Sequence, residues 1–461
     1  THASWAPGSI NTQRDDIDTR IDLAGERWRF RAGYQGFLNV GTGTGITLAL
    51  DPTGDFSVGL TNADFTYNLA QSNLWDISVQ ASYLGTTTEA DLTPFPSGAF
   101  GGLFQDGIRD RFRFRVNETR GGVTALYGGI PAHRFRFGVG FSHSRLSDVA
   151  ESRNFRIGSG GVPLPTLFSD VSAFGEQPLL SEETRTLWYA LAQDEWVFAP
   201  DWILTAGIRL DDYSDFGATV DPRLALVWNL SPTLTAKALY GRAFRAPTFT
   251  ELYGNNIVAT AGNLDLEPEI LNMVEFSLDK TWNPQLQTKA TLYGYNLNNQ
   301  IIGGTTGTAD NPLTKIKKQN LAGRRGYGME LEAEYRVSPD LSLQANYAYY
   351  GFRASELNDY SRFAPEHQIY TAMDWQIGHG WSLNGRLKWV SGRHYDFLGD
   401  DEYLWGSASL RYTHPNGWYF TLALDNMFDV DAAEPTIFAA IPYGIPLPGR
   451  SILAQFGWRL P

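Results

Sequence analysis

The sequence predicts an all-β protein, a transmembrane antiparallel β-barrel with about 18 strands. From Glu26 onward, segments of about ten residues alternate in polarity, which is typical of a barrel wall with one face in lipid. No apolar run reaches the roughly 18 residues that a membrane-spanning helix needs. Short turns and long loops alternate between the segments, which indicates two different rims.

Two segments, 202–211 and 327–337, show the alternation most clearly. In the second segment, Glu330, Glu332 and Glu334 share one face, and tyrosine, methionine, leucine, alanine and valine share the other. A soluble β-sandwich would bury such an apolar face in its core. In a barrel, the apolar face meets lipid and the glutamates line the lumen.

The connections sort into two sets. Short turns are expected at 70–73, 131–133, 199–201, 231–233, 283–285, 338–340, 378–380 and 415–417, and longer connections at about 37–60, 86–108, 147–183, 247–269, 303–313, 356–366, 394–402 and 428–450. Tryptophans stand beside five of the short turns, at Trp75, Trp202, Trp282, Trp381 and Trp418, as an interfacial girdle requires. The short-turn rim is therefore expected to be periplasmic.

Two further expectations follow from this arrangement. The residues 110–130 must form one strand across Gly121 and Gly122, because a hairpin there would break the alternation of rims. Residues 1–25 are expected to form a periplasmic arm outside the barrel, which then occupies residues 26–461. No capped helix stands out.

Composition excludes several classes of protein. The net charge of −13 and scattered basic residues argue against nucleic-acid binding. Cysteine is absent, which excludes disulfides and thiol chemistry. We find no nucleophile and base arrangement, no phosphate loop and no spaced set of metal ligands, so neither enzyme, cofactor nor metal is predicted.

Residues 241–253, Gly-Arg-Ala-Phe-Arg-Ala-Pro-Thr-Phe-Thr-Glu-Leu-Tyr, together with Gly-Asn-Leu-Asp-Leu-Glu-Pro-Glu at 262–269, resemble the signature loop of the TonB-dependent outer-membrane receptors. The signature residues are Phe244, Arg245, Ala246, Pro247, Glu267, Pro268 and Glu269. Weaker matches follow in the expected order at 326–332, 362–367, 424–429 and 448–450. The resemblance covers roughly residues 200–461.

The resemblance implies a 22-stranded barrel with an N-terminal plug that imports scarce ligands with energy from the inner membrane. Nothing ahead of Glu26 is large enough to be that plug, and the predicted strand count is about four short. Two explanations stay open. Another polypeptide supplies the plug and the first strands, as in a split receptor, or the chain closes as a narrower, plugless barrel. We favour the first.

The expected function is therefore import of a ferric siderophore or similar scarce nutrient across the bacterial outer membrane. The alternative is a passive porin or binding barrel. The expected partners are membrane lipid and lipopolysaccharide, a plug polypeptide, the TonB complex acting through that plug, and an extracellular small molecule. The candidate ligand-binding residues lie in the long loops: Phe249, Tyr253, Asn255, Asn256, Tyr395 and Trp405.

Phe244 to Pro247 are expected to be mainly architectural, because the proline ends strand pairing. The row Glu330, Glu332 and Glu334 is expected to be a wet lumen wall or a docking surface for plug arginines. No histidine stands between Thr248 and Asn263, where haem receptors of this family carry one, so haem is disfavoured.

Overall fold

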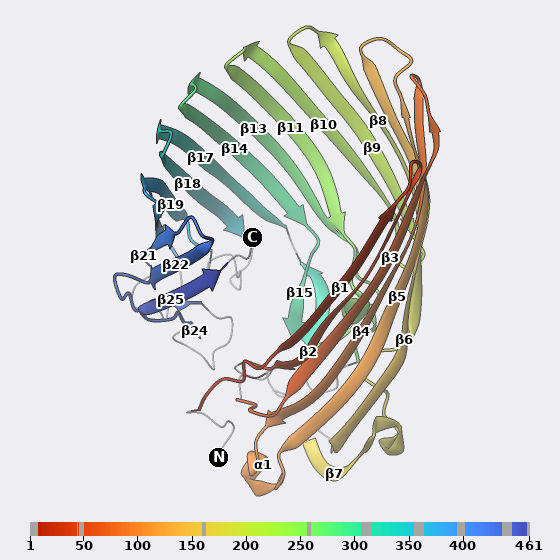
Figure 1. The fold of residues 1–461 in the computed structure, drawn as a ribbon. Helices are drawn as coiled ribbons and strands as arrows, with labels where there is room; N and C mark the ends of the chain where they lie inside the picture. Colours follow the sequence, from red (N-terminus) through yellow and green to blue (C-terminus); the bar gives the residue numbers. More distant parts are fainter. Residues whose placement is uncertain are drawn as a thin grey trace.

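The computed structural model describes residues 8–43, 45, 50–158, 163–255, 260–305, 316–321, 323–354, 364–393, 402–435 and 445–458. In this part of the chain, twenty strands form one antiparallel sheet. The sheet curves around a broad interior, with successive strands side by side (Figure 1). None of the helices in the described part is long and apolar enough to cross a bilayer.

Nineteen of the twenty strands follow one another as neighbours in chain order, each antiparallel to the next. They are β1 (Asp15–Ala24), β2 (Trp28–Gly41), β3 (Asp55–Gln71), β4 (Trp75–Phe95), β5 (Ile108–Tyr127), β6 (His133–Ile157), β8 (Glu183–Ala199), β9 (Trp202–Tyr213), β10 (Gly217–Ser231), β11 (Leu234–Arg245), β13 (Glu269–Asn283), β14 (Leu286–Asn298), β17 (Arg324–Ser338), β18 (Leu341–Ala354), β19 (His367–Gly378), β20 (Trp381–Ser391), β21 (Tyr403–Thr413), β22 (Trp418–Asp425) and β25 (Ser451–Trp458). The twentieth, β7 (Pro163–Asp170), pairs with the outer part of β6.

Smaller elements lie in the long connections. They are α1 (Ala99–Gly102), the 3-10 turn η2 (Val171–Phe174), α2 (Phe249–Tyr253), a three-stranded sheet of β12 (Thr260–Ala261), β15 (Gln300–Thr305) and β16 (Ile316–Leu321), and the pair β23 (Ala433–Glu434) and β24 (Ile445–Pro446). We call the edge of the sheet that carries them the long-loop rim; α1 and β7 lie there at the bottom of Figure 1.

Strand register keeps the two faces of the sheet distinct. Between β14 and β17, Leu292 lies opposite Met329, and the next pair, Thr291 and Glu330, is polar. Leu292 is 54% exposed although it is apolar, as a side chain that meets lipid should be. The predicted all-β antiparallel fold and its alternation are confirmed.

The aromatic girdle also lies where it was predicted. Trp75, Trp202, Trp381 and Trp418 each begin a strand directly after a short turn, and Trp282 lies one residue before the end of β13. Neighbouring aromatic rings extend the girdle, for example Trp228, whose ring stacks on that of Trp202 at a centroid distance of 4.5 Å.

The prediction of a single strand across Gly121 and Gly122 is confirmed by β5, which pairs with β4 and β6 on both sides of these glycines; the strand ends at Tyr127, three residues before the predicted end. The two glycines are covered by aromatic side chains: a Cβ built on Gly121 would meet the Phe141 ring, and one on Gly122 would meet the Tyr189 hydroxyl. The rings of neighbouring strands therefore fill the space that the missing side chains leave.

The start of the sheet differs from the expectation. Residues 15–24 form β1, which pairs with β2 along its whole length, so the sheet begins before Glu26. The turn after β1 is short. At the other end of β1, Asn11 precedes the strand, pairs with Gly43, and donates to the carbonyl of Gly54 beside the long connection between β2 and β3. The residues ahead of β1 thus lie at the long-loop rim, not at the short-turn rim.

The two outermost strands run in the same direction. The nineteen successive strands alternate in direction, so β1 and β25 both run from the long-loop rim to the short-turn rim. In the described part of the chain each of them is paired on one side only. Direct pairing of β1 with β25 would be parallel, and an antiparallel closure needs an odd number of additional strands.

Tyrosines cover glycines at several places on the wall. Tyr293 and Tyr295 on β14 lie opposite Gly328 and Gly326 on β17, and a Cβ built on either glycine would overlap the facing ring. The hydroxyl of Tyr295 also lies 2.7 Å from that of Tyr350 on β18. Glycine is required at these positions because the rings lie flat against the backbone of the next strand.

Candidate functional site

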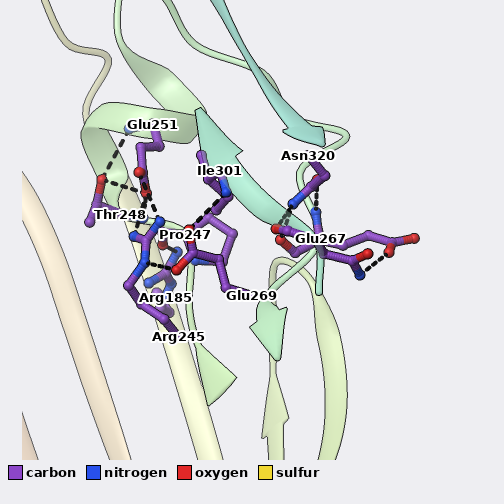
Figure 2. A network of polar contacts seen from close by, with 10 residues as sticks. Arg185, Arg245, Pro247, Thr248, Glu251, Glu267, Glu269, Ile301 and Asn320 are labelled. Atoms are coloured by element: carbon purple, nitrogen blue, oxygen red, sulfur yellow. Dashed lines mark hydrogen bonds and ion pairs between the residues drawn. The ribbon is translucent and has the colours of Figure 1, made fainter. Parts of the chain in front are cut away.

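Arg245 at the end of β11 contacts both ends of the connection from β11 to β13, residues 246–268. Its Nε donates to Oε2 of Glu269 at 2.7 Å, and its Nη1 donates to Oε2 of Glu251 at 2.9 Å (Figure 2). One guanidinium therefore joins the end of β11, the helix α2 and the first residue of β13. A planar fork with several donors is suited to holding two carboxylates at once.

The pKa values of this Arg245 clamp reflect the pairing. The hydrogen bonds that Arg245 donates to Glu269 and Glu251 hold the pKa of Arg245 above its ordinary value. Burial acts to raise the pKa of Glu251 and of Glu269, but hydrogen bonds, first those from Arg245, outweigh it and leave both pKa values below 4.5. All three groups lie at the long-loop rim, beyond the lipid-facing part of the strands.

Helix α2 starts with a capping box that the sequence analysis overlooked. The backbone N–H of Glu251 donates to Oγ1 of Thr248 at 3.2 Å, and the N–H of Thr248 donates to Oε2 of Glu251 at 2.8 Å. The spacing Thr-x-x-Glu is the sequence signal for this motif. Glu251 thus serves both the capping box and the Arg245 clamp.

The far end of the connection is held through the small sheet. Oε1 of Glu269 accepts from the backbone N–H of Ile301 on β15 at 2.7 Å. Asn320 on β16 forms two bonds with the backbone of Glu267, donating to its carbonyl and accepting from its N–H, both at 2.8 Å (Figure 2). The side chain of Glu267 accepts from Asn299 at 2.8 Å. The acidic signature residues therefore anchor β15 and β16.

Arg185 on β8 supports the other side of the Phe-Arg-Ala-Pro segment. Its Nη2 donates to the carbonyl of Pro247 at 2.8 Å, and its Nε donates to Asp215 at 2.7 Å. The Phe249 ring lies over the guanidinium, with the ring centroid 5.0 Å from Cζ. The sequence analysis missed Arg185 because its partners lie 30 and 62 residues away.

Three of the six candidate ligand residues lie together. Phe249 and Tyr253 are on α2 with their ring centroids 6.0 Å apart, and both are half-buried. Asn255 follows, and its backbone N–H donates to the carbonyl of Leu179 at 2.7 Å. Tyr253 packs on the cluster of Leu252, Leu266 and Ile301. Asn256 and Tyr395 lie outside the described residues.

Trp405, the sixth candidate, belongs to a different cluster. Its Nε1 donates to Oδ1 of Asp425 at 3.0 Å, and its ring packs beside Val390, Tyr403 and Ala432. Trp405 therefore helps to hold the base of the connection between β22 and β25, and the structure does not bring it together with Phe249 and Tyr253 in one cluster.

Asn426 holds the base of that same connection. Its side chain has no exposed surface, and its backbone has a φ of 47°, a left-handed conformation that asparagine tolerates. Nδ2 donates to the carbonyls of Val430 at 2.9 Å and Pro448 at 3.1 Å, and Oδ1 accepts from the N–H of Val430 at 2.8 Å. This Asn426 anchor is the structural role of the Asp-Asn-Met-Phe-Asp element.

A separate group of charged side chains is buried near the long-loop end of β5 and β6. Arg153 is 2% exposed and pairs with Glu151 at 3.2 Å and with Glu176. Burial, and then the charge of Asp110, raises the pKa of Glu151 to about 7. Burial raises the pKa of Asp110 to about 6. In the described residues, no three histidine or acidic side chains form a group that could hold a metal ion.

Comparison with known proteins identifies the family of this chain. The family described as "TonB dependent receptor-like, beta-barrel" matches residues 4–427. The iron-regulated outer membrane virulence protein of Vibrio cholerae is 28% identical over 274 residues, which is 55% of this chain and 38% of the relative. The vitamin B12 transporter BtuB of the same species is 29% identical over 155 residues, 33% of this chain and 23% of the relative.

The fold is also that of a solved receptor. The siderophore receptor PirA from Acinetobacter baumannii superimposes with a TM-score of 0.69 at 15% identity, covering 99% of this chain and 72% of PirA. The chain thus spans well under half the length of the two curated relatives that it matches. On the family match and the fold together, this chain belongs to the TonB-dependent receptor family and forms a β-barrel wall of the bacterial outer membrane.

Proposed function

We propose that this chain is the wall of a receptor that imports a ferric siderophore or a similarly large, scarce nutrient with energy from the TonB system. Membership of the family supports receptor function, and the names of the relatives cover siderophore and vitamin B12 receptors. Phe249, Tyr253 and Asn255 at the long-loop rim, with Asn256 and Tyr395, are the proposed ligand contacts. Trp405 is proposed only as a support for the loops, because its indole N–H is engaged by Asp425.

We further propose that another polypeptide supplies the plug and the first strands. The observation that carries this proposal is that β1 and β25 run in the same direction, each with one unpaired edge among the described residues. Unpaired backbone groups are costly in lipid, and direct closure would put a parallel pair into an antiparallel wall. An odd number of added strands avoids both problems, and three strands added to the nineteen successive ones would make 22.

The polypeptide composition of the native protein tests this second proposal. We expect denaturing gels and intact mass to show a chain of 51.3 kDa together with a second polypeptide that carries a plug. A single 51.3 kDa species, or one longer polypeptide that contains both the plug and this chain, would contradict it.

Uptake measurements test the import proposal separately. Cells that express the assembled receptor are supplied with a radiolabelled ferric siderophore panel and with cobalamin, before and after the proton gradient is collapsed. Energy-coupled import predicts that uptake stops when the gradient is lost. Uptake that persists without a gradient would instead favour the passive porin or binding barrel.

A further inference from the structure

The apolar face of the wall carries an oblique groove across β13, β14 and the five strands from β17 to β21. Two adjoining hollows, of about 660 and 480 Å³, share Ala333 and Ala345 in their lining. Ala290 on β14 extends the floor formed by these two alanines. The groove exists because these side chains are small.

Larger side chains form the walls of the groove. Leu331 and Tyr347 stand on one side of Ala333 and Ala345, and Tyr335 and Leu343 stand on the other. Leu331, Tyr335 and Leu343 are 39%, 44% and 38% exposed, so the walls of the groove project outward. Polar residues that also border the larger hollow belong to the opposite face: Lys289 and Glu332 pair there at 3.2 Å.

A lysine stands at the short-turn end of the larger hollow. Lys280 on β13 lies on the apolar face, opposite Leu234, and its Nζ donates to Oγ1 of Thr233 at 3.0 Å. The same Nζ lies 5.7 Å from the centre of the Trp282 ring, and the Trp282 indole N–H donates to Thr288 at 2.9 Å. A cation beside a girdle tryptophan lies at the depth of lipid headgroups.

We propose that the groove is a binding site for one anionic glycerophospholipid of the periplasmic leaflet, with an acyl chain over Ala333 and Ala345 and the phosphate at Lys280. An empty groove on a lipid-facing wall loses dispersion contacts on one side, and an ordered chain restores them. Lys280 lies at the headgroup end of the groove, where its charge is complementary to a phosphate. The site is independent of the imported ligand and of how the wall is closed between β1 and β25.

Native mass spectrometry of the assembled receptor, extracted in mild detergent and incubated with phosphatidylglycerol or phosphatidylethanolamine, tests the site. The wild type is expected to retain one phospholipid and to prefer phosphatidylglycerol. The substitution Lys280→Gln is expected to reduce phosphatidylglycerol retention about fivefold, which is the effect of one lysine near an anionic surface. The matched control is Lys237→Gln. Lys237 lies on the adjacent strand β11, and its Nζ pairs with Asp279 at 2.6 Å.

The substitution Ala333→Leu fills the groove and is expected to abolish retention of either lipid. Its control is Ala206→Leu, an alanine-to-leucine change on the apolar face of β9. If Ala333→Leu fails to assemble, the comparison of Lys280→Gln with Lys237→Gln still tests whether the phospholipid binds at this site. Equal loss in both lysine variants, retention of lipopolysaccharide instead, or a change in oligomeric state without a change in bound lipid would overturn the proposal.

Discussion

Two long connections of this receptor are anchored at their bases by different chemistry. The β11–β13 connection depends on the Arg245 clamp, in which an arginine side chain that is 42% exposed binds two carboxylates. The β22–β25 connection depends on Asn426, a neutral amide with no exposed surface and three hydrogen bonds to backbone. The charged anchor responds to pH and salt, whereas the Asn426 amide itself carries no charge that could titrate or be screened.

The largest effect is expected from Asn426→Asp. An ionised carboxylate cannot donate to Val430 and Pro448, so two buried acceptors lose their donor and a charge is buried. We expect a loss of about 3 kcal/mol of stability, since each unsatisfied buried group costs 1–3 kcal/mol. Thermal unfolding of the detergent-solubilised barrel measures it, with Asn416→Asp at a short turn as the control. Equal melting of the two variants would contradict the anchoring role.

A smaller effect is expected from Arg245→Gln. The partly exposed ion pairs contribute about 1 kcal/mol, because solvent screens them. Removing the arginine also leaves the carboxylates of Glu251 and Glu269 close together. Limited proteolysis of residues 246–268 should therefore become faster, and the double variant Arg245→Gln with Glu251→Gln should recover part of the protection. If the double variant is cut faster than the single one, repulsion is not the cause.

The smallest and most selective effect is expected from pH. The pKa values of Glu251 and Glu269 lie below 4.5 in the folded protein, so their contribution is present above that pH and is lost as pH falls through the folded values. Amide exchange at the base of the β11–β13 connection, corrected for the intrinsic rate, should quicken as the pH falls below 4.5 and these carboxylates become protonated. The variant Glu251→Gln has no ionisable group at that position, so its exchange should lose part of this dependence, which makes it the control.

For the buried carboxyl of Glu151, the expected pH dependence of stability has the opposite direction. Its folded pKa of about 7 lies above the ordinary 4.5, so its contribution is present below pH 4.5 and is lost as the pH rises towards 7. Exchange near the outer ends of β5 and β6, corrected for the intrinsic rate, should therefore be faster at high pH, and Glu151→Gln should weaken that dependence and leave the part due to Asp110. A wild type whose exchange there has no pH dependence would contradict the assignment.

The sequence predicts the wall well because each strand carries its own signal. Alternation, short turns and girdle tryptophans are local, and strand β5 follows from keeping the rims consistent. The missed strand β1 also alternates, with Ile17, Ile21 and Leu23 on one face. Its four aspartates and one arginine obscured that pattern, because a lumen-facing row in a barrel is more polar than the exposed face of a soluble sheet.

The candidate site is less predictable because its contacts are not local. The Thr248 and Glu251 spacing is a capping signal that the sequence contains, and it was overlooked. The contacts of Arg185 to Asp215 and Pro247 join three strand ends, and no periodicity reveals them. Trp405 was predicted from its place near a loop, whereas its partner Asp425 lies on the next strand.

The tyrosines that cover glycines have a consequence for how the wall is assembled. A shift of one residue in the register between β14 and β17 would move every side chain of one strand to the other face of the sheet. A shift of two residues keeps apolar side chains on the apolar face, so polarity alone does not disfavour it. After such a slip, either Tyr293 would face Glu330 or Tyr295 would face Arg324, and only one ring would still meet a glycine. The Tyr293 and Tyr295 pairs thus distinguish the correct alignment from its nearest polarity-preserving competitor while the strands zip together.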